Sequence, residues 1–486
     1  MRLSQNANPF RSEKVIWASL LLILTIWSYF SYNNWISDSE YWPISLSGHW
    51  DLWRQQPALI YKPLFHLSLS WIYLFDLDSV QHLHVAKAFY TFLGVLSFVF
   101  FFLILRRQLK SLKALLVTFI FLFSNLGFSQ VGVIRSDFLS FFITLLYFYW
   151  IPKVKSQSWI QVSIYTAFFS LLLILCTPKS IFFCILIFIY SFFKLEKGIH
   201  RFRFFLVCGW LSIIATYLMS LWLGSGEMMN AFLSALQFAR DSYRDPKVVG
   251  FFSEYMSRYT LHDILIWMLF IIGFVYQLIL FKRKKQLEAL AYEVIILFIF
   301  LFYMIHHPAT AFFVGSYFGL LFLAQCYFWR RIPEFILLGV LVANIAILCW
   351  NLKPLYYYSN KIEFETVRKI SDFVKGSIPQ GKIFDGLAVG PRDSYMLHYV
   401  GPDDESAHSQ IIEAIKTERP ELVSYSSRVA LLEPAIGEIL RESYKPIGIG
   451  YWLRKDIQTK EYLNLAWPPF FVFVYEPYPS HLGEKK

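Results

Sequence analysis

The chain has 486 residues, of which 56% are hydrophobic, 20% are aromatic and only 16% are charged. A soluble domain of this length does not bury so much apolar surface, so the composition favours a membrane protein with several spanning helices. The formal net charge of +11 does not indicate a nucleic-acid groove, because the positive excess lies in short clusters between the apolar runs of residues 1–360.

Apolar runs of about 20 residues can cross a bilayer as helices. We predict eleven such spans, and the first lacks a signal-peptide cleavage site and is predicted to be retained. The predicted spans are 15–32, 84–105, 112–128, 138–152, 159–177, 180–193, 204–223, 262–281, 290–305, 310–329 and 334–351.

Basic clusters predict the orientation of these spans. Lys and Arg precede the first span and follow every even-numbered one, from Arg106 and Arg107 to Arg330 and Arg331. Cytoplasmic loops carry such an excess, so the N-terminus is predicted in the cytoplasm and the odd-numbered spans end on the outer face. The expected location is a bacterial inner membrane, with 33–83 as the first outer loop.

The first outer loop contains candidate catalytic residues. In an extended segment the side chains of Asp38 and Glu40 would point the same way. Either carboxylate could act as a general base or bind a divalent cation, or both could be solvated loop charges. Lys62 precedes the short apolar stretch 64–75, which is predicted to lie along the membrane surface as a helix beginning near Pro63. This lysine could bind a phosphate or reach the lipid headgroups.

Three later outer turns contain ionisable residues, which are costly near a membrane unless they have a partner or a function. Arg135 and Asp137 precede the fourth span, where they could pair with each other, or the arginine could bind a phosphate. Lys179 stands alone between two apolar runs and is a second phosphate-binding candidate. His306 and His307 lack the other ligands of a zinc site, and we expect them to line a polar cavity or donate hydrogen bonds.

The segment 352–486 has the charge density of a soluble domain. Helices are predicted at 364–374, 409–417 and 432–444, and strands at 382–389, 421–426 and 470–475. This alternation predicts a small α/β domain on the outer face, following a transmembrane module at 1–351. No glycine-rich phosphate loop lies between a strand and a helix, so no nucleotide is expected.

The order of these motifs resembles the GT-C class of membrane glycosyltransferases, particularly the protein O-mannosyltransferases and the aminoarabinose transferases. The matching motifs, within 15–358, are Asp38-Ser39-Glu40, Lys62-Pro63-Leu64, Arg135 with Asp137, and Lys179. The sequence departs from the family pattern at two places. Ser39 separates the two acids, and Tyr61 stands where some relatives have an acid.

The resemblance implies that a sugar moves, with inversion, from a polyprenyl-phosphate donor to a hydroxyl of a lipid, glycan or protein. Asp38 or Glu40 would be the base and, if a metal is used, its ligand. The residues implied to hold the donor phosphate are Lys62, Arg135 and Lys179, with Asp137, His306 and His307 in support.

Other functions fit parts of the sequence. A transporter or flippase of lipid-linked saccharides would favour internal repeats and charged or broken helices at mid-membrane, and no clear repeat is present. A polymerase or ligase would share the donor without requiring the acidic pair. A membrane scaffold would use the outer charges structurally.

Overall fold

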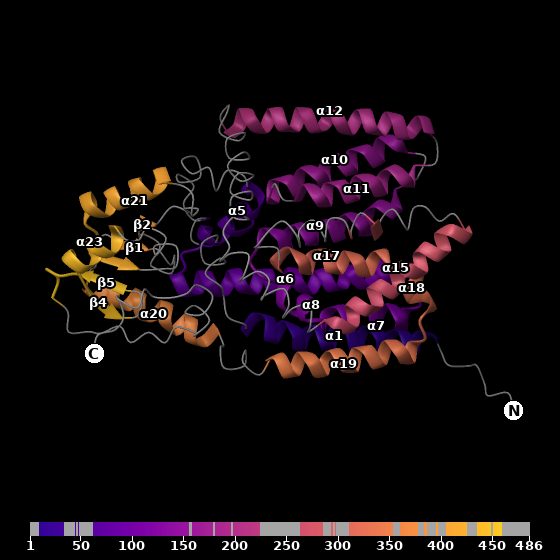
Figure 1. The fold of residues 1–486 in the computed structure, drawn as a ribbon, viewed down its shortest axis with the longest axis horizontal. Helices are drawn as coiled ribbons and strands as arrows, with labels where there is room; N and C mark the ends of the chain where they lie inside the picture. Colours follow the sequence, from indigo (N-terminus) through magenta and orange to yellow (C-terminus); the bar gives the residue numbers. More distant parts are fainter. Residues whose placement is uncertain are drawn as a thin grey trace. The chain divides into compact units, whose positions relative to one another are not determined.

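The computed structural model describes parts of the whole chain (Figure 1). The described residues are 9–33, 44, 47, 62–154, 158–177, 180–195, 198–223, 263–284, 293, 294, 297, 311–352, 360–377, 383–385, 395–396, 405–424, 435–448 and 451–458. The chain divides into two compact units. The first contains Met1–Tyr32, Ile60–Phe65 and Ala88–Lys353, and the second contains Asn33–Leu59, His66–Lys87 and Pro354–Lys486.

The helices coincide with the apolar runs. Each predicted span except 290–305, most of which lies outside the described residues, corresponds to one helix or to two consecutive helices. The helices are α1 (Pro9–Asn33), α6 (Ser79–Arg106), α7 (Ser111–Leu122), α8 (Asn125–Gln130), α9 (Ser136–Trp150), α10 (Trp159–Cys176), α11 (Ile181–Lys194), α12 (Gly198–Leu223), α15 (Ile264–Lys284), α17 (Ala311–Ala324), α18 (Cys326–Arg331) and α19 (Glu334–Leu352).

Among the described residues, four helices are long and apolar enough to cross a membrane. They are Glu13–Asn33, Val80–Arg106, Trp159–Cys176 and Ile264–Lys282. Large apolar side chains such as Trp210, Ile271 and Phe335 are more than half exposed. A helical protein with such an outer surface has the character of a membrane protein.

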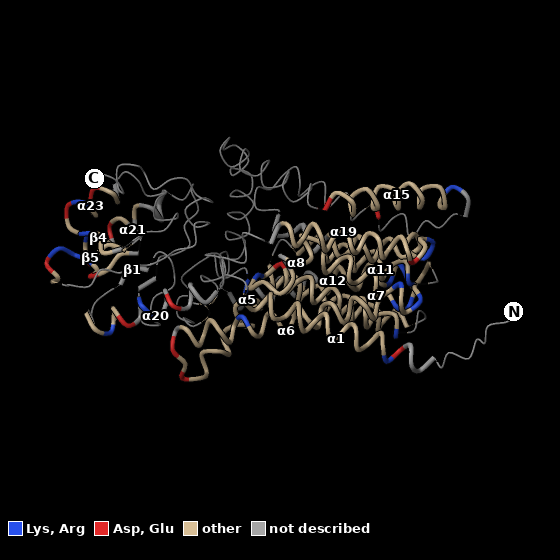
Figure 2. The backbone as a smooth tube through the Cα atoms, turned by 90° about the horizontal axis from the view of Figure 1, so that it is seen from below, with Lys and Arg blue, Asp and Glu red and all other residues tan. Residues whose placement is uncertain are grey.

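Lys and Arg gather at one end of helices α7 and α11 (Figure 2). Several of them donate hydrogen bonds to backbone carbonyls at helix ends. Arg107 bonds the carbonyl of Tyr149 at 2.7 Å, and Lys113 bonds that of Ile332 at 2.7 Å. Cations complement the negative end of the helix dipole, so these residues also hold the helix ends together.

Two predicted spans are interrupted. The span 112–128 is wrong as a continuous helix, because α7 ends at Leu122 and α8 begins at Asn125. The Ser124 hydroxyl donates to the Phe121 carbonyl (2.7 Å) and accepts from the Gly127 N–H (2.8 Å), replacing main-chain helix bonds. The span 310–329 is divided at Gln325, between α17 and α18.

The second unit contains a five-stranded sheet of order β2-β1-β3-β5-β4. β1 is parallel to β2 and β3, and β5 is antiparallel to β3 and β4. The strands are β1 (Ile383–Asp385), β2 (Tyr395–Met396), β3 (Leu422–Ser424), β4 (Tyr444–Gly448) and β5 (Tyr451–Arg454), and the helices are α20 (Asn360–Ser377), α21 (Glu405–Glu418) and α23 (Ala435–Ser443).

Most predicted elements of this segment are present. The predicted helices 364–374 and 409–417 lie within α20 and α21, and β1 and β3 lie within predicted strands. The predicted helix 432–444 is wrong at its end, because Tyr444 begins β4, and the β4–β5 pair was not predicted. The predicted strand 470–475 lies outside the described residues.

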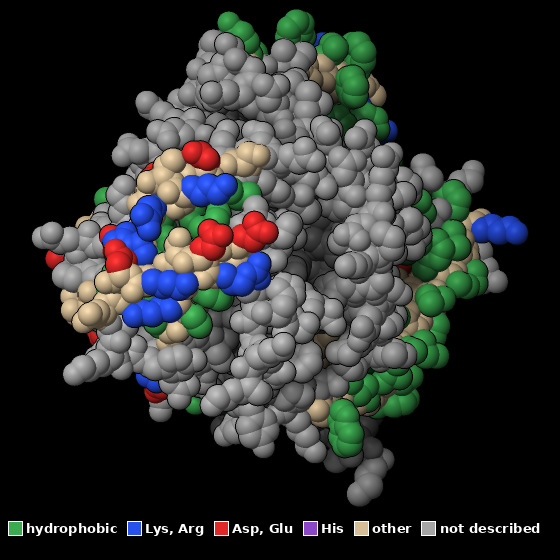
Figure 3. All heavy atoms as spheres, turned by 60° about the vertical axis from the view of Figure 1, so that its left-hand side comes forward, with side chains coloured by type: hydrophobic (Ala, Val, Ile, Leu, Met, Phe, Trp, Pro, Cys, Tyr) green, Lys and Arg blue, Asp and Glu red, His purple; other side chains and the backbone are tan. Residues whose placement is uncertain are grey.

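The described face of this sheet-containing unit mixes both signs of charge (Figure 3). On α20 the exposed residues Glu365, Arg368, Lys369 and Asp372 follow helical spacing, and Phe373 and Val374 are buried. Opposite charges three or four residues apart support a solvated helix face. This face therefore has the composition expected of a surface in water.

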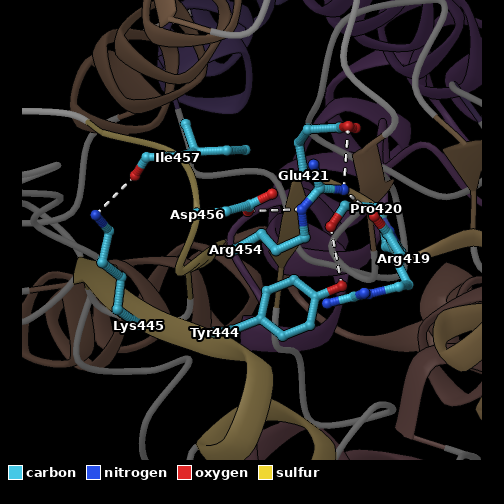
Figure 4. Close-up of polar contacts among 8 residues, drawn as sticks. All are labelled: Arg419, Pro420, Glu421, Tyr444, Lys445, Arg454, Asp456 and Ile457. Atoms are coloured by element: carbon cyan, nitrogen blue, oxygen red, sulfur yellow. Dashed lines mark hydrogen bonds and ion pairs between the residues drawn. The ribbon is translucent and has the colours of Figure 1, made fainter.

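A polar network ties β4 and β5 to the end of α21 (Figure 4). Arg454 pairs with Asp456 at 2.8 Å and with Glu421 at 3.2 Å. The hydrogen bond from Arg454 holds the pKa of Asp456 below its ordinary value. The buried Tyr444 hydroxyl donates to the carbonyl of Pro420 at 2.9 Å.

We expect Tyr444→Phe to lower the free energy of unfolding of this unit by about 1 kcal/mol, because the carbonyl of Pro420 loses its donor. Burial raises the pKa of the Tyr444 phenol from 10.0 to about 12. The neutral phenol is the form favoured in the folded protein, so its contribution is complete below pH 10 and is lost as the pH rises through about 12. Melting followed by tryptophan fluorescence should show a difference between the two proteins that shrinks over this range. A constant difference would contradict the assignment.

Candidate functional site

The structure describes three of the predicted site residues: Lys62, Arg135 and Asp137. The others, Asp38, Glu40, Lys179, His306 and His307, lie outside the described residues. The described parts of the candidate site are the turn containing Arg135, the helix that follows Lys62, and the residues that flank Lys179.

Arg135 and Asp137 lie at the start of α9. Arg135 has extended backbone and occupies the N-cap position, and its carbonyl accepts the Leu139 N–H at 3.2 Å. Asp137 stands in the first turn and is buried. A carboxylate there interacts favourably with the helix dipole, which gives Asp137 a structural role whatever its function. The Arg135 side chain is half-buried.

The turn before Arg135 packs tightly against α1. Gly132 has φ +82°, and a Cβ there would lie 2.9 Å from the Trp27 ring and 3.0 Å from Ser31 Oγ. Only glycine combines this left-handed backbone with such a close approach. The turn with Arg135 is thus fixed against the last turns of α1.

A hydrogen bond links the beginnings of α9 and α11. The hydroxyls of Ser140 and Ser180 are 2.6 Å apart, and both residues are fully buried. The Ser180 N–H donates to the Thr177 carbonyl at 2.9 Å, which closes a turn between α10 and α11. Pro178 and Lys179 of this turn are outside the described residues. The two turns predicted to bind phosphate therefore have flanking residues that meet at one end of the bundle.

Aromatic contacts bring the helix after Lys62 to the same place. Helix α5 (Pro63–Ser70) and the following 3-10 turn (Trp71–Leu74) confirm the predicted short helix. Phe65 packs edge-on against Tyr90 of α6, with ring centroids 6.2 Å apart. Tyr90 in turn lies 6.1 Å from Phe138, in the first turn of α9. Lys62 and Arg135 each stand three residues before a member of this aromatic chain.

Asp263 is a buried acid at this end that sequence reasoning missed. It is 1% exposed, and its carboxylate accepts the N–H groups of Asn125 at 2.8 Å and Leu126 at 3.1 Å. These are the first donors of α8, which have no partner within the helix. An acid at the start of an apolar run is itself a sign of a functional or structural role. Its partners, Asn125 and Leu126, lie far away in the sequence and could not be predicted.

Lys87 was also missed. It lies on α6, one turn before Tyr90, and is 1% exposed. A lysine so deeply buried is costly, so it is a candidate for holding an anion or for a role in folding. The signal was a lone lysine inside the run that begins α6.

The described residues contain no group of three or more His, Cys, Asp or Glu that could hold a metal ion. Asp38 and Glu40, the predicted ligands, are not among them. The divalent cation therefore stays a prediction for Asp38 and Glu40.

Comparison with family models, curated proteins and solved structures found no match.

Proposed function

We propose that the protein is a membrane glycosyltransferase that moves a sugar from a polyprenyl-phosphate donor to an acceptor hydroxyl. The observation that carries the proposal is the hydrogen bond between Ser140 and Ser180 at 2.6 Å. It joins the turn of Arg135 to residues that flank Lys179, so that two cations would face one phosphate. The aromatic chain from Phe65 adds the start of α5, next to Lys62, to the same end.

The chemistry requires a base and a stabilised leaving group. The Asp38 carboxylate takes the acceptor proton, and the acceptor oxygen attacks the anomeric carbon from the face opposite the phosphate. The bond from the anomeric carbon to the phosphate oxygen breaks, and polyprenyl phosphate leaves with the electron pair. Arg135, Lys179 and Lys62 balance its growing charge in a partly dry site. Glu40 either assists Asp38 or replaces it as the base.

The proposed placement is eleven spans in a bacterial inner membrane, with the N-terminus in the cytoplasm and 352–486 as an outer α/β domain. Its support is the cluster of cations at one end of the bundle (Figure 2). Arg107 bonds the carbonyl of Tyr149 near the end of α9, whereas Arg135 stands at the start of the same helix. A lipid-linked donor would then meet the acceptor at the outer membrane boundary.

The proposal is tested with purified protein in detergent and a panel of polyprenyl-phosphate sugars. Sugar transfer and release of free polyprenyl phosphate are both measured, because water can replace an unknown acceptor. Release from one donor supports the proposal and identifies the sugar. A transporter or flippase would bind the donor without releasing free polyprenyl phosphate. A polymerase or ligase would elongate a saccharide. A scaffold would neither bind nor turn over any donor.

We expect Arg135→Ala to lower kcat/KM for the donor about 100-fold, because an electrostatic contact to the leaving phosphate is lost. Arg135→Lys, which keeps the charge but not the planar fork, should lose less. Initial rates at varied donor and acceptor concentrations check the assignment. A variant whose use of the acceptor falls while its use of the donor is unchanged would contradict the phosphate role of Arg135.

A further inference from the structure

The first unit contains a second polar cluster, close to the helix ends that carry basic residues. It consists of Glu293, Gln277 on α15, and Gln325 between α17 and α18. Glu293 and Gln325 are each 1% exposed, and Gln277 is 2% exposed. Gln277 stands five residues before Lys282, and Gln325 five before Arg330. None of the residues proposed for sugar transfer belongs to this cluster.

Hydrogen bonds fix the orientation of both amides. Gln325 Nε2 donates to Glu293 Oε1 at 2.5 Å and to the carbonyl of Phe270 at 2.9 Å. Turning this amide over would place its oxygen against two acceptors. Gln277 Nε2 donates to the carbonyl of Ala324 at 3.2 Å, which sets its amide in the same way.

Three buried oxygens are thereby left without a donor among the described residues: Glu293 Oε2, Gln325 Oε1 and Gln277 Oε1. Gln325 Oε1 faces α15, since a Cβ at Gly273 would lie 2.6 Å from it. Gln277 is four residues further along α15 and so lies on the same face of that helix. Both amide oxygens thus belong to the packing interface of α15 with the residues around Gln325.

No described cation neutralises this carboxylate. On the described side chains of α15 and α18 the titratable or charged residues are Tyr276, Lys282, Cys326, Tyr327, Arg330 and Arg331, with Asp263 just before α15. The neighbouring helices α7 and α19 add Lys113, Glu334 and Cys349. Among the described residues, none of these forms a hydrogen bond or ion pair with Glu293, and Lys282, Arg330 and Arg331 are exposed at the helix ends. A buried carboxylate whose one described hydrogen bond comes from a neutral amide is strongly disfavoured unless a cation joins it.

We infer that Glu293, Gln325 and Gln277 form a binding site for one monovalent cation, either a proton or sodium. The carboxylate supplies the compensating charge, and the amide oxygens supply neutral ligands of the kind that coordinate alkali ions. A proton on Glu293 Oε2 turns that oxygen into a donor to an amide oxygen, whereas a sodium ion contacts all three acceptors. The two cations compete for one site.

Dicyclohexylcarbodiimide, which modifies protonated carboxyl groups in apolar surroundings, tests the site in the wild-type protein. Peptide mass spectrometry follows the modification of Glu293 over a pH series, in choline chloride and in sodium chloride. We expect modification in choline to slow about tenfold per pH unit above its midpoint. Slowing by sodium at constant pH identifies sodium as the ligand, and no sodium effect identifies the proton. Absence of modification at every pH, or a rate that responds to neither cation, overturns the inference.

Two helical glycines provide matched variants. A Cβ at Gly273 would meet Gln325 Oε1, whereas a Cβ at Gly339 on α19 would meet nothing within 4 Å. Gly273→Ala should weaken cation binding and so lower the midpoint by about one pH unit or weaken sodium protection about tenfold, while Gly339→Ala should match the wild type. Gln277→Leu, which removes one oxygen without adding bulk at Gly273, should act in the same direction. Wild-type behaviour of both Gly273→Ala and Gln277→Leu would overturn the three-oxygen site.

Discussion

Asp38→Asn is expected to abolish sugar transfer while the protein still inserts into the membrane. A carboxamide has nearly the shape of the carboxylate but cannot accept the proton of the acceptor hydroxyl. Loss of a general base costs about 10²- to 10⁴-fold in rate. The measurement is release of polyprenyl phosphate together with sugar transfer, in the same detergent and at matched protein concentrations.

Glu40→Gln is the matched control, because the same change is made two residues away. If Asp38 is the base, Glu40→Gln should retain most of the activity, and donor binding should survive in both variants. Normal turnover by Asp38→Asn with loss in Glu40→Gln would assign the base to Glu40. Normal turnover by both single variants and by the double variant would contradict a catalytic acid in this loop.

Helix α1 ends at Asn33, five residues before Asp38 in the sequence, and its last turns pack against Gly132 through Trp27 and Ser31. The same turn leads to Arg135, the candidate for holding the leaving phosphate. The described end of α1 and the turn that leads to Arg135 thus belong to one packed region of the first unit.

Much of the helical fold could be predicted from hydrophobic length alone. The runs 15–32 and 159–177 correspond closely to α1 and α10, because an apolar stretch of this length forms its own backbone hydrogen bonds wherever it is placed. The break between α7 and α8 could not be predicted in this way. It depends on Ser124 and on Asp263, and the carboxylate of Asp263 reaches α8 only through the tertiary fold.

In the candidate site, too, some residues could be predicted from the sequence and others could not. Arg135 and Asp137 were recognisable because they interrupt an apolar pattern at a predicted turn. Lys87 and Glu293 lie inside long apolar runs, where a single charge does not change the prediction of a span. Their significance comes from burial and, for Glu293, from partners on other helices, neither of which a single segment of sequence reveals.

Asp263→Ala is expected to lower the melting temperature by about 5 °C, through a loss of about 3 kcal/mol in unfolding free energy. The substitution leaves the buried N–H groups of Asn125 and Leu126 without their acceptor and removes a negative charge from the start of α8. Since α8 runs directly into the turn of Gly132 and Arg135, loosening it should also lower donor use. Thermal unfolding in detergent and donor kinetics measure the two effects.

Asp263→Asn is the control that separates hydrogen bonding from charge. The amide keeps one acceptor oxygen, so it should recover roughly half of the lost stability. A melting temperature equal to that of the wild type in both variants would contradict the capping role. Lower stability with unchanged donor kinetics would show that α8 and the Arg135 turn are not coupled, because any displacement of that turn would weaken the proposed contact of Arg135 with the donor phosphate.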